Sequence, residues 1–206
     1  MKLNTNFATF KKNHKNKKNQ VIFHKSICKN KKNFQNIIDN ILSKKNSFIF
    51  ESVEKRKVRG RYTILGSDPD KIWEFNKNKI FLKMNNQKKR INANPFTYLK
   101  KIIDNFNFPL PKNIPQLCSL LVGYFSYDII RYIEKIPDNC VNDLKIPDIR
   151  LLRPKILIIH DNLLNNIYFI SNCFADEKIN NYSKYYLNQI KKIRQMKELT
   201  KLKIIK

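Results

Sequence analysis

Apolar residues recur at helical spacing in three parts of the chain. Such a stripe begins at Phe34 and ends at Leu42, which predicts an amphipathic helix. A second stripe follows Asn94-Pro95, where an N-cap residue precedes proline at the first helical position, and this helix must end before Pro109. The third stripe predicts a long helix over about 179–199.

Between these helices, short apolar runs bounded by turn residues predict strands. The first is SFIFESV, residues 47–53, and the run 117–125 has the composition of a central strand in which Gly123 suggests a bulge or a close approach of another backbone. Asp128 can cap a short helix over 129–135. The other predicted strands are 62–65, closed by a turn at 66–70, a hairpin of 72–75 with 80–82, and the pair 155–160 and 167–173.

Strands and helices that alternate irregularly, with hairpins, predict an α+β fold with a mainly antiparallel sheet and packed helices. The ordered domain is expected to span residues 33–199, followed by a tail over 200–206. Residues 1–32 consist of Lys/Asn blocks around one apolar island at 21–23, so a basic, partly disordered segment is expected there, with a short strand at the island as its one candidate element. His14 and His24 are expected to be solvated in that segment.

The charge balance is strongly basic, with 42 Lys and Arg against 16 Asp and Glu and a formal net charge of +26. Such a charge is compatible with a nucleic-acid-binding protein. The excess is mostly Lys spread along every segment together with abundant Asn, which favours a solvated surface instead. No run approaches the length of a membrane span, and no apolar leader segment is expected at the N-terminus.

The four cysteines are far apart and form no C-x-x-C pair, so they predict neither a zinc site nor a disulfide framework. Free thiols fit a reducing cytoplasm. The chain also lacks a P-loop, G-x-S-x-G, G-x-G-x-x-G and H-E-x-x-H, so no catalytic residue and no metal ligand is predicted in it. His160 is expected at a strand edge, and Asp68, Asp70, Asp143 and Asp148 are expected to form turns.

Glu51 and Ser52 stand together at the end of an otherwise apolar strand. Because neighbouring side chains on a strand point to opposite faces, one hypothesis is that one of them is solvated while the other caps a backbone group. The other is a small polar pocket, in which Ser52 exchanges a hydrogen bond and Glu51 meets a cationic group such as an α-ammonium.

Three ordered blocks resemble anthranilate synthase component I. The run from Ser47 to Phe75, SFIFESVEKRKVRGRYTILGSDPDKIWEF, is similar to the family's S-F-L-L-E-S-V-E followed by G-R-Y-S-x-I-G-x-x-P. Residues 121–137, LVGYFSYDIIRYIEKIP, resemble its G-Y-x-x-Y-D-x-x-R-x-x-E-x-x-P. Ile146-Pro147-Asp148, Arg153-Pro154 and Asp161 follow the family's L-P-D, R-P and F-D.

This resemblance concerns the N-terminal domain of the family, and it implies that the catalytic chorismate-binding domain is absent. In the family, chorismate and ammonia give anthranilate and pyruvate in tryptophan biosynthesis. The resemblance therefore implies three partners: a separate C-terminal chorismate-binding domain, a glutamine amidotransferase component II that delivers the ammonia, and L-tryptophan as allosteric ligand. No cofactor is implied for this chain, because the family binds Mg²⁺ in the missing domain. A split gene or a frameshifted tail at Thr200–Lys206 would explain such a fragment.

The resemblance also assigns roles to residues. In the family the L-L-E-S strand helps to form the tryptophan feedback site, so Glu51, Ser52 and Val53 are candidate inhibitor contacts. Structural or interface roles are implied for residues of the other motifs: Arg61, Tyr62, Gly123, Tyr127, Asp128 and Arg131.

The sequence leaves two alternatives open. The N-terminal domain of aminodeoxychorismate synthase component I, an enzyme of folate biosynthesis, shares the architecture, although the G-R-Y and Y-D-x-x-R forms favour anthranilate synthase. A basic nucleic-acid-binding protein is the alternative from another class.

Overall fold

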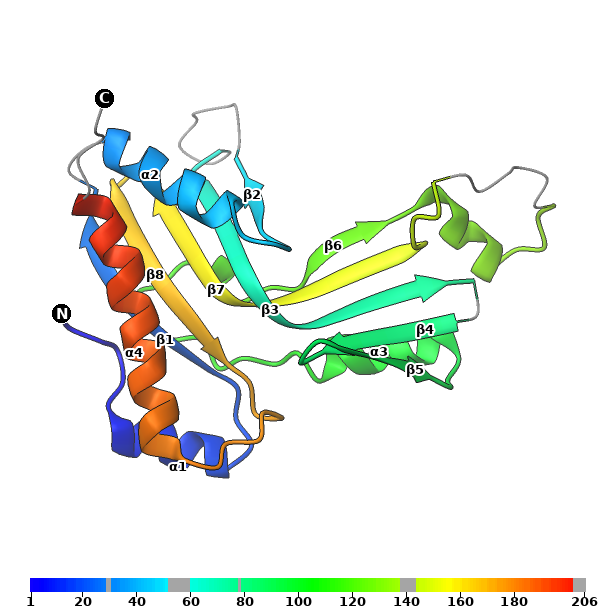
Figure 1. Cartoon of the computed structure of the whole chain (residues 1–206), viewed down its shortest axis with the longest axis horizontal. Helices are drawn as coiled ribbons and strands as arrows, with labels where there is room; N and C mark the ends of the chain where they lie inside the picture. Colours follow the sequence, from blue (N-terminus) through cyan, green and yellow to red (C-terminus); the bar gives the residue numbers. More distant parts are fainter. Residues whose placement is uncertain (29–30, 52–59, 78, 138–143, 202–206) are drawn as a thin grey trace. The chain divides into compact units, whose positions relative to one another are not determined.

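The computed structural model of the chain describes residues 1–28, 31–51, 60–77, 79–137 and 144–201 (Figure 1). Helices are combined with an antiparallel sheet, which confirms the predicted α+β class. In chain order the elements are α1 (Phe7–Lys15), β1 (Gln20–Ile27), α2 (Lys31–Leu42), β2 (Phe48–Phe50), β3 (Tyr62–Asn76), β4 (Lys79–Met84), β5 (Gln87–Ile91), α3 (Pro95–Asp104), the 3-10 helix η1 (Gln116–Cys118), β6 (Val122–Phe125), the 3-10 helix η2 (Tyr127–Tyr132), β7 (Ile149–Asp161), β8 (Asn166–Cys173), α4 (Tyr182–Glu198) and the 3-10 helix η3 (Leu199–Lys201).

The chain forms two compact units where the sequence predicted one domain over 33–199. Unit 1 comprises residues 1–68, 108–119 and 155–206, and unit 2 comprises residues 69–107 and 120–154. The long strands β3 and β7 each contribute residues to both units, since the divisions fall at Asp68/Pro69 and Pro154/Lys155.

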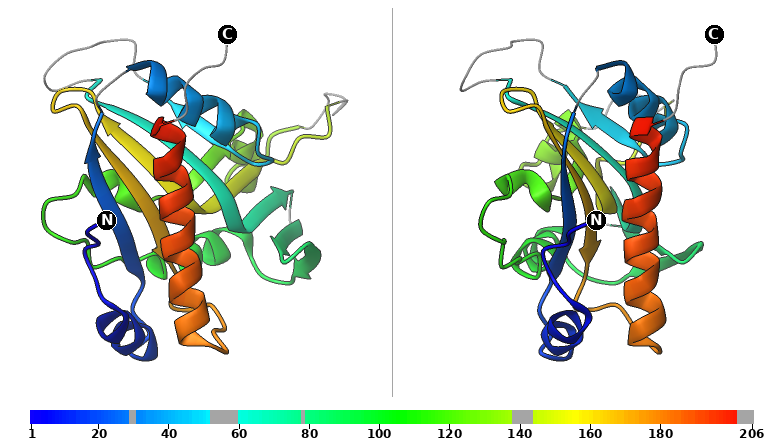
Figure 2. Two further views of the ribbon diagram at one scale, coloured as in Figure 1. Left: turned by 60° about the vertical axis from the view of Figure 1, so that its left-hand side comes forward. Right: turned by 90° about the vertical axis from the view of Figure 1, so that its left-hand side faces the viewer.

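In unit 1 the strands β1, β8, β7 and β3 are neighbours in this order, and β2 pairs with β3. Helices α1, α2 and α4 pack on one face of these strands (Figure 2). Alternate residues of β8, among them Ile167 and Phe169, form the apolar core with residues of the helices such as Phe10, Ile37 and Ile193. This burial is the main source of stability for unit 1.

The first 28 residues are structured, in contrast to the predicted disorder. Asn6 caps α1 by accepting a hydrogen bond from the Thr9 amide at 2.9 Å, and β1 pairs with β8 over its whole length from Gln20 to Ile27. His14 and His24 are correspondingly buried, at 7% and 8% exposure. The short strand considered at the island 21–23 is confirmed, but it is longer than the apolar pattern indicates, because pairing with β8 extends it from Gln20 to Ile27.

In unit 2 the strands β7, β3, β4 and β5 are neighbours in this order, and β6 pairs with β7. Helix α3 packs on one face of this sheet, where Ile102 contacts a core containing Trp73, Phe75 and Leu151. The predicted N-cap is confirmed: the Asn94 side chain accepts hydrogen bonds from the amides of Phe96 and Thr97 at 3.0 and 3.2 Å. The predicted hairpin is also confirmed, since Asn76 lies opposite Lys79.

Two predicted elements around the middle of the chain are confirmed only in part. The run 117–125 forms η1 and the short strand β6, because Pro115 leads into a 3-10 turn and only residues 122–125 pair with β7. The helix predicted over 129–135 is the 3-10 helix Tyr127–Tyr132.

The turn predicted at 66–70 is absent, because β3 runs through these residues. Gly66 pairs with Phe48 of β2, and Ser67 is fully buried. Asp68 takes a positive φ of 53°, which lets the strand change direction locally while its pairing continues. Strand pairing in the sheet therefore overrides a local turn signal.

Candidate functional site

The proposed inhibitor contacts lie at the end of β2. Glu51 directly follows this strand and its side chain is exposed, while Ser52 and Val53 lie outside the described residues. Before it, the rings of Phe48 and Phe50 lie 5.2 Å apart, and Phe50 is 49% exposed. The described part of the strand therefore offers a carboxylate next to a half-exposed aromatic ring. Its role in binding an amino acid stays a prediction.

Arg61 and Asp161 form a bidentate ion pair in unit 1, with Nε–Oδ1 and Nη2–Oδ2 distances of 3.0 and 2.7 Å. The Asp161 side chain is 1% exposed and also accepts hydrogen bonds from the amides of Leu163 and Leu164. Burial acts to raise the pKa of Asp161, but the hydrogen bonds from Arg61 and Leu164 hold this pKa below its ordinary value. The Arg61 guanidinium lies 5.0 Å from the centre of the Tyr62 ring. The structural or interface roles implied for Arg61 and Tyr62 stay predictions.

Asp148 joins three segments of unit 2. Its Oδ2 accepts hydrogen bonds from the Tyr132 hydroxyl at 2.8 Å and from the Lys77 amide at 2.6 Å. Its backbone amide donates to the carbonyl of Phe75, and its carbonyl accepts from the amide of Ser126. Burial and the hydrogen bond to Asp148 raise the pKa of Tyr132. The sequence predicted only a turn at Asp148, because a pattern read along the chain cannot show that Tyr132 and Lys77 converge on it.

The other residues with implied structural roles lie in β6 and η2 of unit 2. A Cβ atom at Gly123 would lie 1.8 Å from the carbonyl oxygen of Arg150, so the predicted close approach of another backbone is confirmed. Asp128 and Arg131 form an ion pair at 3.0 Å, and Arg131 also donates to the carbonyls of Ile136 and Pro137. Tyr127 is 90% exposed, so it has no packing role within the described residues.

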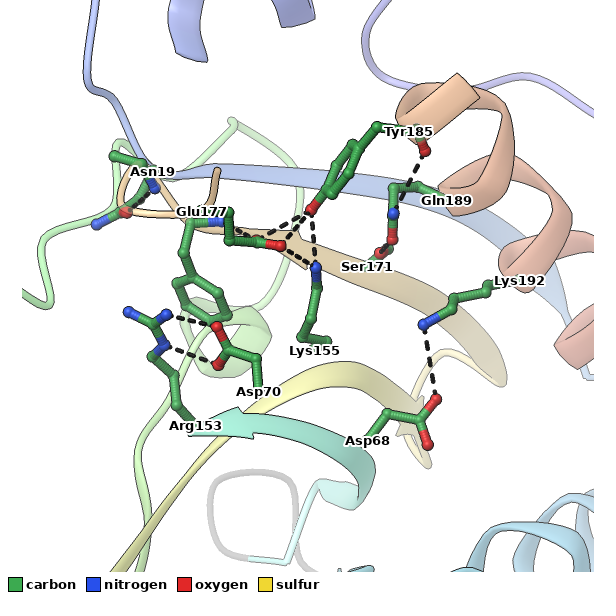
Figure 3. A network of polar contacts seen from close by, with 12 residues as sticks. Asn19, Asp68, Asp70, Arg153, Lys155, Ser171, Glu177, Tyr185, Gln189 and Lys192 are labelled. Atoms are coloured by element: carbon green, nitrogen blue, oxygen red, sulfur yellow. Dashed lines mark hydrogen bonds and ion pairs between the residues drawn. The ribbon is translucent and has the colours of Figure 1, made fainter. Parts of the chain in front are cut away.

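A buried polar cluster that the sequence analysis missed lies between β7, β8 and α4 (Figure 3). The Lys155 ammonium donates to the carboxylate of Glu177 and, at 2.8 Å, to the Tyr185 hydroxyl. Tyr185 donates to Glu177 at 2.9 Å, and the Phe174 amide also donates to that carboxylate. Burial is the main cause that raises the pKa of Tyr185. These groups satisfy one another's hydrogen-bonding capacity, which indicates a structural cluster.

Figure 3 also shows further polar pairs in both units. In unit 1 the Ser171 hydroxyl donates to Gln189 at 2.8 Å, and both side chains are buried. In unit 2 Arg153 binds Asp70 through two hydrogen bonds of 2.8 and 2.5 Å. Asp70 was predicted to form a turn, but it is an ion-pair partner within β3. Asp143, also predicted in a turn, lies outside the described residues.

Among the described residues, no group of three His, Cys, Asp or Glu side chains lies close enough to hold a metal ion. His160 is buried against the ring of Phe34, with the ring centres 4.6 Å apart. In the described part of the chain, no helix is both long and apolar enough to cross a bilayer.

Comparisons with known proteins found similar sequences, among them proteins named anthranilate synthase component 1. The chain is 29% identical over 148 residues to anthranilate synthase component 1 of Acetivibrio thermocellus, which covers 71% of this chain and 29% of that protein. It is 33% identical over 131 residues to the protein of the same name from Acinetobacter calcoaceticus, covering 60% and 26%, and 25% identical over 174 residues to that of Cereibacter sphaeroides, covering 81% and 34%. The chain thus spans about a third or less of the length of these relatives. No family model matches.

A solved structure supports the same fold. The chain superposes on anthranilate synthase component I from Streptococcus pneumoniae with a TM-score of 0.55 at 18% sequence identity, covering 75% of this chain and 32% of that one. The resemblance found in the sequence motifs is confirmed by the sequence relatives, and the fold class by this structure.

Proposed function

We propose that the chain forms the N-terminal part of an anthranilate synthase component I and acts in tryptophan biosynthesis. The observation that carries the proposal is the similarity to proteins of this name over 60–81% of the chain. Contacts within each unit agree with it, because they join the motif blocks. Arg61 of the first block binds Asp161 of the third, and Tyr132 of the second block binds Asp148 of the third.

The proposed reaction is that of the whole enzyme: chorismate and ammonia give anthranilate and pyruvate. This chain contributes no catalytic side chain to it. Chorismate and Mg²⁺ bind the complementary portion of about two thirds of the enzyme, and a glutamine amidotransferase supplies the ammonia. The role of this chain is structural and regulatory: the edge formed by Glu51, Ser52 and Val53 contributes to a site for L-tryptophan. An ammonium group of the ligand would meet the Glu51 carboxylate, and its indole would meet apolar side chains adjacent to this edge.

A chimera tests this proposal. The matched segment of the Acetivibrio thermocellus protein is replaced by this chain, and the chimera is expressed in a bacterial strain that lacks component I. We expect growth without tryptophan from the chimera and none from the same protein with the segment deleted. The purified chain by itself is expected to form no fluorescent anthranilate from chorismate, ammonium and Mg²⁺.

Two results would overturn the assignment. Turnover of chorismate by the purified chain alone would show that it contains a catalytic centre. Rescue of a strain that requires p-aminobenzoate, without rescue of the strain that requires tryptophan, would assign the chain to aminodeoxychorismate synthase instead.

A further inference from the structure

The sheet of unit 2 has a second face, opposite to the face that packs on α3. Trp73 and Phe75 point into the core on the first face, so Glu74 between them points to the second. The same alternation on β7 places Leu151 in the core and Arg150 on the second face. This second face is open to solvent: Tyr124 is 37% exposed, and the side chains of Lys83 and Lys88 are 40% and 51% exposed.

Side chains on this face form a row across neighbouring strands. Tyr124 of β6 lies opposite Arg150 of β7, whose Nε is 3.6 Å from a carboxylate oxygen of Glu74 on β3. Glu74 in turn lies opposite Phe81 of β4, and Phe81 lies opposite Arg90 of β5. Strand register therefore brings residues from five segments of the sequence into one line.

Positive charge exceeds negative charge on this face. The Glu74 carboxylate, 10% exposed, lies 2.6 Å from the Lys83 ammonium, 3.9 Å from that of Lys88 and 3.6 Å from Arg150. One carboxylate thus faces three cations, and it is less exposed than any of them. An approaching molecule therefore meets mainly ammonium and guanidinium groups.

The aromatic residues of this face favour a protein partner over a nucleic acid. The ammonium of Lys88 lies 4.3 Å from the centre of the Phe81 ring and covers it, so this ring is not available to stack on a base. Tyr and Arg, in contrast, are enriched where protein surfaces meet. Carboxylates on a protein surface would complement the excess of cations, and the Tyr124 ring can be buried by the same contact.

We propose that this second face binds an acidic surface of a protein partner. We call it the basic face, and it consists of Phe81, Lys83, Lys88, Arg90, Tyr124 and Arg150. The partner is a polypeptide that presents clustered Asp and Glu side chains to the row of cations. Electrostatic attraction then sets the orientation and the association rate of the complex.

A binding titration with the full chain tests the proposal. The probe is a short fluorescein-labelled polyglutamate peptide, and the affinity is measured by fluorescence anisotropy at physiological ionic strength. The variant is Lys83→Glu/Lys88→Glu. The matched control is Lys89→Glu/Lys100→Glu, which changes the net charge equally but places both substitutions away from the basic face, on the opposite side of β5 and on α3.

We expect the basic-face variant to weaken binding about tenfold or more and the control to stay within about twofold of the unchanged chain. Since reversed charges next to Glu74 can destabilise the strand pair, Lys83→Gln/Lys88→Gln serves as a second variant, and it is expected to weaken binding about threefold or more. If the basic-face and control variants lost peptide affinity equally, net charge alone would explain the binding, and the proposal would be overturned. The same titration is made with a single-stranded oligothymidylate. If this oligonucleotide binds more tightly than the peptide, and if only the basic-face variants weaken its binding, the face binds nucleic acid and the proposal fails.

Discussion

Arg61 and Asp161 are 100 residues apart in the sequence and form a bidentate ion pair, in which the carboxylate is almost completely buried and the guanidinium is partly exposed. Arg61 lies just before β3, and Asp161 is the last residue of β7. The pair thus fixes the ends of two strands to each other within unit 1. Two amides of the following turn, those of Leu163 and Leu164, satisfy the carboxylate further.

This ion pair predicts a loss of stability in acid. Because the pKa of Asp161 is lower in the folded chain than its ordinary value of 3.8, the folded state binds fewer protons there than the unfolded state. The stabilisation is present above the ordinary pKa and is lost as the pH falls from about 4 through the lowered pKa. Urea unfolding at a series of pH values measures this. Asp161→Asn is expected to lower the free energy of unfolding by about 1–2 kcal/mol at neutral pH and to flatten its dependence on pH in this range. If the free energy of unfolding of the variant depended on pH as steeply as that of the unchanged chain, the stabilising role of Asp161 would be contradicted.

Gly123 predicts a steric effect on β6. A methyl group there would overlap the backbone of Arg150, which cannot move away without breaking the pairing of β6 with β7. Gly123→Ala is expected to destabilise unit 2 by about 1–3 kcal/mol. Gly66→Ala is the matched control, because a methyl group at Gly66 would meet first the outer ring atoms of Phe48, and a side chain can rotate away. Equal unfolding midpoints in urea for the two variants would refute this difference.

The buried cluster of Lys155, Glu177 and Tyr185 predicts strong non-additivity. Glu177→Gln leaves the Lys155 ammonium, whose side chain is 12% exposed, without its carboxylate and is expected to lower the free energy of unfolding by about 3 kcal/mol. Lys155→Met/Glu177→Gln removes the charge as well and is expected to lose less than the single variant. A double-mutant cycle by urea denaturation checks this. Additive losses would show that the two groups do not interact.

The buried thiols predict a pattern of alkylation and a second pH effect. Burial raises the pKa of Cys173 to about 12 and that of Cys118 to about 11, so both stay protonated and shielded at mildly alkaline pH. Iodoacetamide is expected to modify the partly exposed Cys28 in the native chain, and Cys118 and Cys173 only after denaturation, as mass spectrometry would show. Cys140 lies outside the described residues and is replaced by Ser for this experiment.

The same buried thiols are expected to lower the stability of the folded state at alkaline pH. An unfolded thiol loses its proton near its ordinary pKa of 9.0, whereas the folded Cys173 keeps its proton until about pH 12. The free energy of unfolding is therefore expected to fall as the pH rises above 9. Cys173→Ala should reduce this alkaline slope, and an identical slope would argue against it.

The proposed regulatory edge predicts a change in feedback inhibition. In the chimera described above, Glu51→Gln removes the carboxylate that would meet the α-ammonium of tryptophan, and we expect the concentration for half-inhibition to rise about tenfold, since one charge-assisted hydrogen bond is worth about 1.5 kcal/mol. Turnover without tryptophan should stay the same, because Glu51 is exposed and supports no core contact. Asp39→Asn on α2 is the control, because it also removes one negative charge but is not part of the proposed edge. Unaltered inhibition in Glu51→Gln would show that Glu51 is not part of the tryptophan site.

The amino-acid sequence alone determined the elements whose signals are local. The cap at Asn94, the hairpin at Asn76 to Lys79 and the strands on either side of residues 162–165 depend on neighbours within a few residues, and all of them are confirmed. At Gly123 the sequence indicated a bulge or a close approach of another backbone, and the structure shows the close approach. The motifs also identified the family that the chain resembles.

Only the tertiary structure decided which distant residues meet. Strand β3 passes through a sequence typical of a turn because it stays paired in the sheet, and the segment 20–27 becomes a strand because it pairs with β8 over its whole length. The contacts of Asp148, Glu177 and Glu74 were hidden for the same reason: each carboxylate is paired by groups from other strands or helices. Hydrogen bonds and ion pairs depend on distances in space, and those distances follow from sheet register and not from spacing along the chain.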